Sequence, residues 1–471
     1  MLKIKLINSI KNLLNTNLFT FKNLVKIYFF FIFILIIGNI ITIFTCANLP
    51  IAEVPVIWPI SNGCFRFFIP EVNVYSLSFP QFIFVFENFI VVLIYTFFFL
   101  LLLKYLNYIK KPVFLYLIGI GSVFLSNLIQ GYYNGFIYPL VGEVGKEYLG
   151  DAIKITDSLS FIRNYNSIQT SLFCHSRTHP PGAVLVYKFA NDLFSDPLII
   201  GLVIMCVSLL SIFYIYKLIK EWFNEDTAIF ICLLFIFLPA TQIYYLSSLD
   251  SLIAFFFLAT FYYYLKWSKN NKFLDYILCV MFLFFSIFLT YMVIFLFLLL
   301  FICLIKDKNF KRIVFLFLPI VIVFLGFYYL LNFNYITGFL TTSKLENPHG
   351  FLFLNKPLLY FLTRFEDVAE ILLFSGPLVI FFVYQGLKNK TNKLVTLSRI
   401  SIIVLFLLFL IGAYRTGETA RGCLFIYPFL LIPIAFYFFN RGGVNIFEKR
   451  QILFLLWVQS TIMQIIIFYV W

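Results

Sequence analysis

The residues that could carry out a reaction gather between Tyr132 and Asp196, the longest polar interruption in an otherwise apolar sequence. Within it, Asp151 follows Gly150 and opens a helical pattern of apolar residues. A carboxylate at a helix start beside a bilayer can bind a metal ion or take the proton of an attacking hydroxyl group. The simpler alternative is a structural acid that caps the first turn of a helix. Both interpretations of Asp151 stay open on spacing alone.

A second motif in this stretch is Thr-His-Pro-Pro-Gly, which contains His179 and ends at Gly182. The two prolines remove backbone donors and stiffen the chain before the helix expected over residues 183–194, which we predict to be amphipathic and to lie along the surface. A histidine held in this way can donate to a phosphate oxygen. An ordinary turn into a helix is the alternative.

Composition defines the elements that must position these residues. The chain has 471 residues, of which 62% are hydrophobic and 12% charged, whereas a soluble domain has about 45–50% apolar and about 25% charged residues. Repeated apolar runs of about 20 residues predict many membrane-spanning helices. The net charge of +14 is then explained by lysines in short cytoplasmic loops, and we expect no nucleic-acid partner.

Alternation of apolar runs with lysine-rich loops predicts an all-α polytopic membrane protein of about 11–13 spans with a large extracytoplasmic loop. The N-terminus is predicted to be cytoplasmic. Four parts are expected: a basic amphipathic segment at residues 1–25; three spans with a proline-rich external loop at 26–131; the extracytoplasmic loop at 132–196; and a bundle at 197–471 with external loops 332–370 and 412–423.

Two details of the bundle follow from the same pattern. The apolar stretch from Phe273 to Ile305 is too long for one helix and has lysine at both ends, which predicts two half-helices or a tight hairpin broken near Thr290. A later span is predicted from Ile371 to Tyr384. The eight cysteines are scattered without metal-binding spacing, and a disulfide between Cys64 and Cys174 is left open.

The predicted outer loops also differ from the inner ones in charge type. Lysine dominates the inner loops, whereas most arginines and all three histidines fall outside. Arginine presents a planar fork that matches phosphate and carboxylate groups, while lysine is a hydrated point charge. This pattern predicts an external active site for an anionic ligand, with chance as the alternative explanation for only three histidines.

At this point the sequence resembles the GT-C superfamily of membrane glycosyltransferases, and most of all its protein O-mannosyltransferase and aminoarabinose-transferase branch. The resemblance rests on Asp151, the His-Pro-Pro motif at His179, the segment from Leu238 to Asp250, the broken stretch at 273–305 and Gly-Glu-Thr-Ala-Arg, which ends at Arg421. The resemblance implies a GT-C-like fold. It departs at Ala152, which stands where the superfamily often has a second acid.

The resemblance implies transfer of a sugar from a polyprenyl-phosphate donor to an extracytoplasmic acceptor at the cytoplasmic membrane. Asp151 is then the catalytic base, and donor-phosphate binding falls to Arg177, His179, Arg415 and Arg421. Supporting roles fall to Glu147, Asp157, Arg163, Asp250 and Glu418. No cofactor is certain, and the departure at Ala152 leaves open whether a divalent metal such as Mg²⁺ or Mn²⁺ takes part. Tyr132, Tyr133 and Tyr148 could stack on sugar or isoprenoid, or serve as an interfacial aromatic belt.

Two other classes of function compete with this prediction. A transporter or flippase would place ionisable groups near the membrane midplane on broken helices, and the stretch at 273–305 is the one feature that favours it. A polysaccharide-assembly subunit without transferase activity would tolerate the loss of Asp151, which an enzyme would not.

Overall fold

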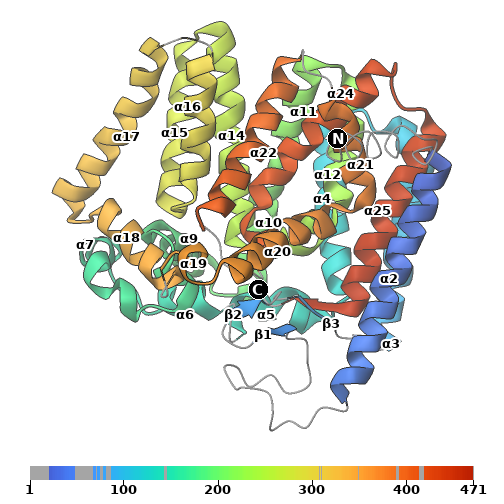
Figure 1. Ribbon diagram of the computed structural model, residues 1–471, viewed down its shortest axis with the longest axis horizontal. Coiled ribbons are helices and arrows are strands. Elements are labelled where there is room, and N and C mark those ends of the chain that lie inside the picture. The colour runs from blue at the N-terminus through green and yellow to red at the C-terminus, as the bar shows by residue number, and fades with distance from the viewer. Residues whose placement is uncertain are drawn as a thin grey trace, which may run out of the picture.

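The computed structural model describes residues 21–47, 67–69, 72–74, 78–80, 86–142, 146–306, 308, 310–347, 350–388, 392–412 and 418–469. Helices make up nearly all of this part of the chain (Figure 1). The prediction of an all-α polytopic membrane protein is confirmed. Residues 1–20 of the predicted basic segment, Cys64 and Arg415 lie outside the described residues.

The first helices are α2 (Phe21–Ala47), α3 (Phe86–Lys104), η3 (Leu106–Tyr108) and α4 (Pro112–Leu128). Four three-residue strands occur in the described chain: β1 (Phe67–Ile69), β2 (Val72–Val74), β3 (Ser78–Pro80) and β4 (Ile467–Tyr469). β1 pairs with β2, and β3 pairs with β4, both antiparallel. The second pair joins the region after the first helix to the C-terminal helix.

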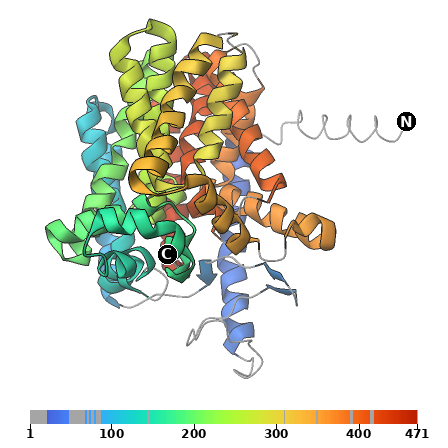
Figure 2. The ribbon, with the colours of Figure 1, turned by 90° about the vertical axis from the view of Figure 1, so that its left-hand side faces the viewer.

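A group of short helices follows: η4 (Tyr133–Ile137), α5 (Tyr138–Val141), α6 (Lys146–Ala152), α7 (Ser158–Ile168), η5 (Gln169–Ser171), α8 (Cys174–Arg177) and α9 (Pro181–Phe194). Figures 1 and 2 both show α6, α7 and α9 together across one end of the bundle. The helix predicted at residues 183–194 is confirmed as α9, whose buried residues recur at helical spacing.

The remaining helices form the bundle and its connections. They are α10 (Pro197–Leu209), α11 (Ser211–Trp222), α12 (Glu225–Phe237), α13 (Pro239–Tyr244), α14 (Leu249–Asn270), α15 (Phe273–Leu289), α16 (Val293–Lys306), α17 (Phe310–Leu331), α18 (Tyr335–Glu346), α19 (Leu352–Asn355), α20 (Pro357–Ser375), α21 (Pro377–Leu387), α22 (Lys393–Leu410), α23 (Thr419–Gly422), η6 (Leu424–Ile426), α24 (Tyr427–Asn440) and α25 (Ile446–Ile466).

Several of these helices are long and apolar enough to cross a bilayer. Among the described residues, four helices pass by length and composition, a fifth candidate is the bent pair of α20 and α21, and six shorter apolar helices accompany them. The predicted number of 11–13 spans therefore depends on the shorter helices crossing as well.

The predicted break near Thr290 is confirmed, because α15 ends at Leu289 and α16 begins at Val293. A further break separates α12 from α13 at Leu238, which is extended (ψ 135°). The reason is Pro239, since a proline disfavours the helical conformation of the residue before it.

The predicted span from Ile371 to Tyr384 is wrong. Helix α20 begins earlier, at Pro357, ends at Ser375 and meets α21 at an angle of 101°. The chain turns at Gly376, whose φ of 81° is in the left-handed region that glycine tolerates, and Pro377 starts the next helix with a fixed φ. Two directions are therefore built into a stretch that hydropathy alone would assign to one span.

The two ends of the bundle carry different charged groups. Asp250 lies in the first turn of α14 and Lys266 near its other end, about 24 Å apart at 1.5 Å per residue. Ion pairs at the Lys266 end join Lys266 to Asp275 and Lys220 to Glu225. The Asp250 end instead meets the short helices described above, so arginine and histidine gather there.

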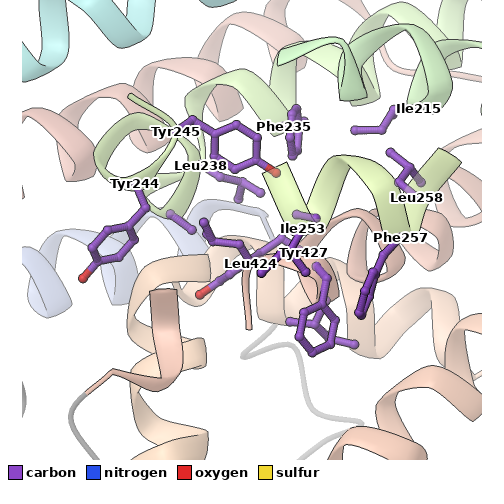
Figure 3. Packing of buried hydrophobic residues seen from close by; sticks show 14 of the residues in the cluster. Ile215, Phe235, Leu238, Tyr244, Tyr245, Ile253, Phe257, Leu258, Leu424 and Tyr427 are labelled. Carbon is purple, nitrogen blue, oxygen red and sulfur yellow. The ribbon is translucent and has the colours of Figure 1, made fainter. Parts of the chain in front are cut away.

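The core near Asp250 is apolar and tightly packed. Figure 3 shows Tyr244 and Tyr245 beside Leu238, with Leu424 and Tyr427 close by. All five are nearly fully buried. This cluster fixes the start of η6, and therefore the segment just before it, against α13 and α14.

Candidate active site

The candidate site forms where the start of α14, the short helix α23 and the helices α6 to α9 meet. Arg421, in α23, has its Nε 3.4 Å from Oδ2 of Asp250 and its Nη2 3.0 Å from Oε2 of Glu418. The same Nη2 lies 3.3 Å from Nε2 of His175, the second residue of α8. We call Asp250, Glu418, Arg421 and His175 the Arg421 cluster. It joins segments that lie up to 246 positions apart in the chain.

Electrostatics keep the guanidinium group of Arg421 charged. Burial would lower the pKa of Arg421, but Glu418 and Asp250 outweigh it and raise the pKa above its usual value. Within the described part of the chain, Nη1 of Arg421 makes no hydrogen bond, and it is not among the fully buried polar atoms. The two carboxylates therefore hold the arginine fork in one orientation and leave one of its edges to donate to a ligand.

Tyr148 and His179 line the cluster on the side of α6 and α9. The hydroxyl oxygen of Tyr148 is 3.1 Å from Nδ1 of His179, and the same Nδ1 is 3.1 Å from the carbonyl oxygen of His175. The ring of Tyr148 stacks on Tyr187, with centroids 5.3 Å apart and planes 3° from parallel. We assign the proton of His179 to Nδ1, because the carbonyl oxygen of His175 only accepts, and Nε2 is then left as an acceptor.

Burial, with a further contribution from His175, lowers the pKa of His179 to about 4. The side chain is therefore neutral near pH 7, when its single N–H is already engaged by His175. A cationic contact from His179 to a phosphate is disfavoured on these grounds. Its place between Tyr148 and His175 instead fixes the turn that leads into α9.

A pH-dependent loss of stability follows from the lowered pKa of His179. Below its ordinary pKa of about 6.5, the unfolded chain binds a proton that the folded chain refuses until about pH 4. Stability is therefore unaffected above pH 6.5 and falls between pH 6.5 and 4, by on the order of 1–2 kcal/mol at pH 5. Thermal unfolding in detergent at pH 7.5 and pH 5 should show a smaller acid-induced decrease in Tm for His179→Gln than for wild type. Equal decreases in Tm for the two proteins would contradict this prediction.

The glycine that ends the Thr-His-Pro-Pro-Gly motif has a packing role. A Cβ atom on Gly182 would lie 2.2 Å from the carbonyl oxygen of Phe288, at the end of α15. Only glycine allows α9 to approach the broken stretch this closely. The hydroxyl of Tyr187, further along α9, donates to the carbonyl of Ser247 at 3.0 Å, which secures α9 beside the start of α14.

Asp151 does not open a helix, contrary to the prediction, because it lies in the last turn of α6. Its side chain is buried. Oδ2 accepts the backbone N–H of Phe173 at 2.9 Å, and Oδ1 lies 3.1 Å from Nζ of Lys154. Phe173 is the N-cap of α8, so Asp151 ties α6 to the helix that carries His175. The acid that begins a helix is Asp157, the N-cap of α7.

The other predicted site residues are placed as follows. Arg163 is exposed on α7, outside the Arg421 cluster. Arg177 has its Nη2 3.9 Å from Sγ of Cys174, and its Nε is buried without a hydrogen-bond partner in the described chain. Glu147 lies in α6. Tyr132 and Tyr133 are 57% and 56% exposed, which favours an interfacial role.

Sequence reasoning missed His175 and two acids of α20. Asp367 and Glu370 are buried and bond to residues 419 and 420. His175 carried a signal, since it is one of only three histidines. Asp367 and Glu370 show no such signal in the sequence, because their partners lie about 50 residues away and only the fold brings them together.

The sequence leaves open whether a divalent metal ion takes part. No group of three or more His, Cys, Asp or Glu side chains in the described chain is arranged to hold a metal ion. In the Arg421 cluster a permanently charged guanidinium lies between the two carboxylates. A divalent cation would be repelled from that position, so these residues do not fit a metal.

Comparison with known proteins adds to this geometry. Residues 178–332 match the model of the family described as dolichyl-phosphate-mannose-protein mannosyltransferase. The matched range begins next to His179 and includes Asp250. No curated protein matches the chain.

Two solved structures of ArnT from Cupriavidus metallidurans are similar to this chain at 12% identity. The apo form gives a TM-score of 0.44 and covers 66% of this chain and 72% of that one. The form bound to undecaprenyl phosphate gives 0.43, with 71% and 77% covered. The family match over residues 178–332 agrees with the resemblance to protein O-mannosyltransferases predicted from the sequence.

Proposed function

We propose that this protein is a glycosyltransferase of the GT-C superfamily, which transfers a sugar from a polyprenyl-phosphate donor to an acceptor outside the cytoplasmic membrane. The observation that carries the proposal is the Arg421 cluster, in which Asp250 and Glu418 orient a guanidinium group beside the His-Pro-Pro segment. The family matched by residues 178–332 is described by a lipid-phosphate sugar donor, dolichyl-phosphate-mannose, which supports this class of donor.

In the proposed reaction the acceptor oxygen forms a bond to the anomeric carbon while the bond from that carbon to the phosphate oxygen breaks. Negative charge builds up on the leaving polyprenyl phosphate. The unengaged edge of Arg421 donates to that phosphate, an interaction that strengthens as the charge develops. Two carboxylates and one guanidinium carry no net positive charge, so the cluster contributes an oriented hydrogen-bond donor rather than bulk positive charge.

A base must take the proton of the acceptor hydroxyl. We propose Asp151 for this role, as the sequence suggested. Its carboxylate accepts from Phe173 and lies against Lys154, and two oxygens with about four lone-pair sites leave room for one more donor. Lys154 is mostly exposed, so it can move aside when an acceptor binds.

The proposed location follows from the distribution of charge. Lysine-rich loops favour the cytoplasmic side, and Lys266 lies at the end of α14 opposite the Arg421 cluster. The cluster would then face the extracytoplasmic side, where the head group of a membrane-bound donor is available. Aromatic side chains near the cluster, such as Tyr148 above Tyr187, offer a flat surface for a sugar ring.

A metal-independent reaction is expected, because Arg421 occupies the position between the carboxylates that a cation would need. Transfer by the purified protein should be unchanged within about twofold after dialysis against EDTA, and added Mg²⁺ or Mn²⁺ should not stimulate it. Activity that is lost in EDTA and restored by a single divalent cation would contradict this expectation.

The proposal is tested by incubating the purified protein with a radiolabelled polyprenyl-phosphate sugar and a membrane extract, and measuring label in the acceptor fraction. Label transferred by wild type, but not by boiled protein, supports the proposal. A protein that moves the labelled donor across proteoliposome membranes and transfers no sugar would favour the flippase alternative.

A further inference from the structure

Helix α20 has its polarity arranged in an unusual way. The buried face carries Thr363, Asp367 and Glu370, whereas large apolar residues occupy the exposed face. Those exposed residues are Leu358, Phe361, Leu362, Phe365 and Leu372. The carboxylates of Asp367 and Glu370 therefore point into the protein while Phe361 and Phe365 point outward, as expected for a helix that contacts lipid on one side and a polar site on the other.

The buried acids of α20 accept hydrogen bonds from the two residues that precede Arg421. Oδ1 of Asp367 accepts the hydroxyl of Thr419 at 2.6 Å. Oε2 of Glu370 accepts the backbone N–H of Ala420 at 3.1 Å. Both contacts fall on the two residues just before Arg421, so α20 fixes the backbone from which the guanidinium extends.

Arg364 links Asp367 to α22. Its Nη2 lies 3.2 Å from Oδ2 of Asp367, and its Nη1 donates to the carbonyl of Phe409, near the end of α22, at 2.8 Å. Asp367 is therefore anchored on one oxygen while the other holds Thr419. A mobile carboxylate could not fix Thr419 in the same way.

The orientation of α20 explains how Asp367 and Glu370 can be held in fixed positions beside Thr419 and Ala420. It makes an angle of 101° with α21, so if α21 crosses the bilayer, α20 lies close to the membrane plane. Figure 1 shows α20 crossing the lower part of the bundle while α22 and α25 run along it. The exposed Leu358, Phe361 and Phe365 would then insert among lipid chains, which holds the helix against the site.

We propose that Asp367 and Glu370 are positioning residues that aim Arg421 at the donor phosphate, and that α20 is the membrane-embedded element that carries them. This inference rests on the proposed transfer function. Helix α23 has only four residues, too few to be stable alone, so its geometry depends on contacts from outside. A displacement of about 1 Å at a reacting group can cost on the order of a hundredfold in rate.

The experiment compares transfer by Asp367→Ala and Glu370→Ala with the conservative variants Asp367→Asn and Glu370→Gln, which keep an oxygen to accept from Thr419 and Ala420. Ser375→Ala is the matched control, because Ser375 is also buried on α20 and, among the described residues, its hydroxyl bonds only to Ile371 in its own helix. We expect about a tenfold or larger decrease in kcat for each alanine variant, as for loss of a hydrogen bond to a charged group. The conservative variants and Ser375→Ala should stay within about threefold of wild type.

A double-mutant cycle with Arg421→Gln separates positioning from a general loss of folding. If Asp367 acts through Arg421, Asp367→Ala should lower the residual activity of Arg421→Gln by less than about twofold. An equal fractional decrease in both backgrounds would overturn the proposal.

Hydrogen–deuterium exchange gives a readout that does not depend on transfer. Peptides that cover residues 418–423 should exchange faster in Glu370→Ala than in wild type or Ser375→Ala. Unchanged exchange overturns the positioning role. Faster exchange in a chain whose wild type transfers no sugar would instead show that the contact is real and that the proposed function has failed.

Discussion

Replacing Arg421 by Gln is expected to lower kcat for sugar transfer by about 10²–10³-fold, the usual effect of removing one donor that stabilises developing charge. Gln keeps an amide donor, but it is shorter than Arg and loses the fixed charge and the fork. Asp250 and Glu418 would then face each other without the cation that lies between them. The measurement is steady-state transfer with saturating labelled donor.

Two further variants make this prediction specific. Arg421→Lys keeps the charge without the planar fork and should recover only part of the rate. Arg163→Gln removes an exposed arginine of the neighbouring α7 and should leave kcat within about twofold of wild type, because surface substitutions rarely matter. If Arg163→Gln is as damaging as Arg421→Gln, bulk positive charge rather than the orientation of Arg421 explains donor binding.

The second large effect is expected for Asp151→Asn, which should lower kcat by about 10²–10⁴-fold if Asp151 is the base. Asn retains an oxygen that can accept the N–H of Phe173, so the tie from α6 to α8 should survive. A purely structural role would instead spare Asp151→Asn and damage Asp151→Ala. Transfer rates and Tm values of both variants in the same detergent distinguish the two roles.

A folded Asp151→Asn protein that transfers at the wild-type rate would remove Asp151 as the base. Asp250 and Glu418 would then be the next acids to test, since both lie in the Arg421 cluster. Asp157, which the sequence offered as a support, is occupied by the N–H groups of Leu159 and Ser160 at the start of α7. Its replacement should affect stability more than rate.

Hydropathy and lysine spacing predicted the class of fold and the break at Thr290, because both follow from local sequence. They did not predict how α20 and α21 divide the region around Gly376. A sliding window averages over an apolar stretch and ignores the one residue that can adopt a left-handed conformation. The direction of α20 depends on its tertiary partners, which hydropathy does not describe.

The sequence predicts part of the candidate site, because some of its residues are recognisable from their local surroundings alone. His179, Asp250, Glu418 and Arg421 stand out as polar residues beside apolar spans, and the structure brings all four into one region. Motif spacing alone predicts the wrong place for Asp151 in its helix, because a glycine often marks a helix boundary, whereas Gly150 lies inside α6.

The acids of α20 illustrate the limit of local reasoning. Asp367 and Glu370 resemble ordinary surface charges in a loop until Thr419 and Ala420 are placed against them. No periodicity or motif links positions about 50 residues apart, and a single sequence offers no other signal for such a pair.

The most direct test of the account is transfer of radiolabelled sugar from polyprenyl phosphate to a membrane-extract acceptor by the purified wild type, with Arg421→Gln and Arg163→Gln assayed beside it. The account predicts that wild type and Arg163→Gln transfer label at similar rates and that Arg421→Gln transfers almost none. If the wild type binds polyprenyl phosphate yet moves no label from any donor, the glycosyltransferase account is contradicted, and a role in lipid transport or polysaccharide assembly becomes the better explanation.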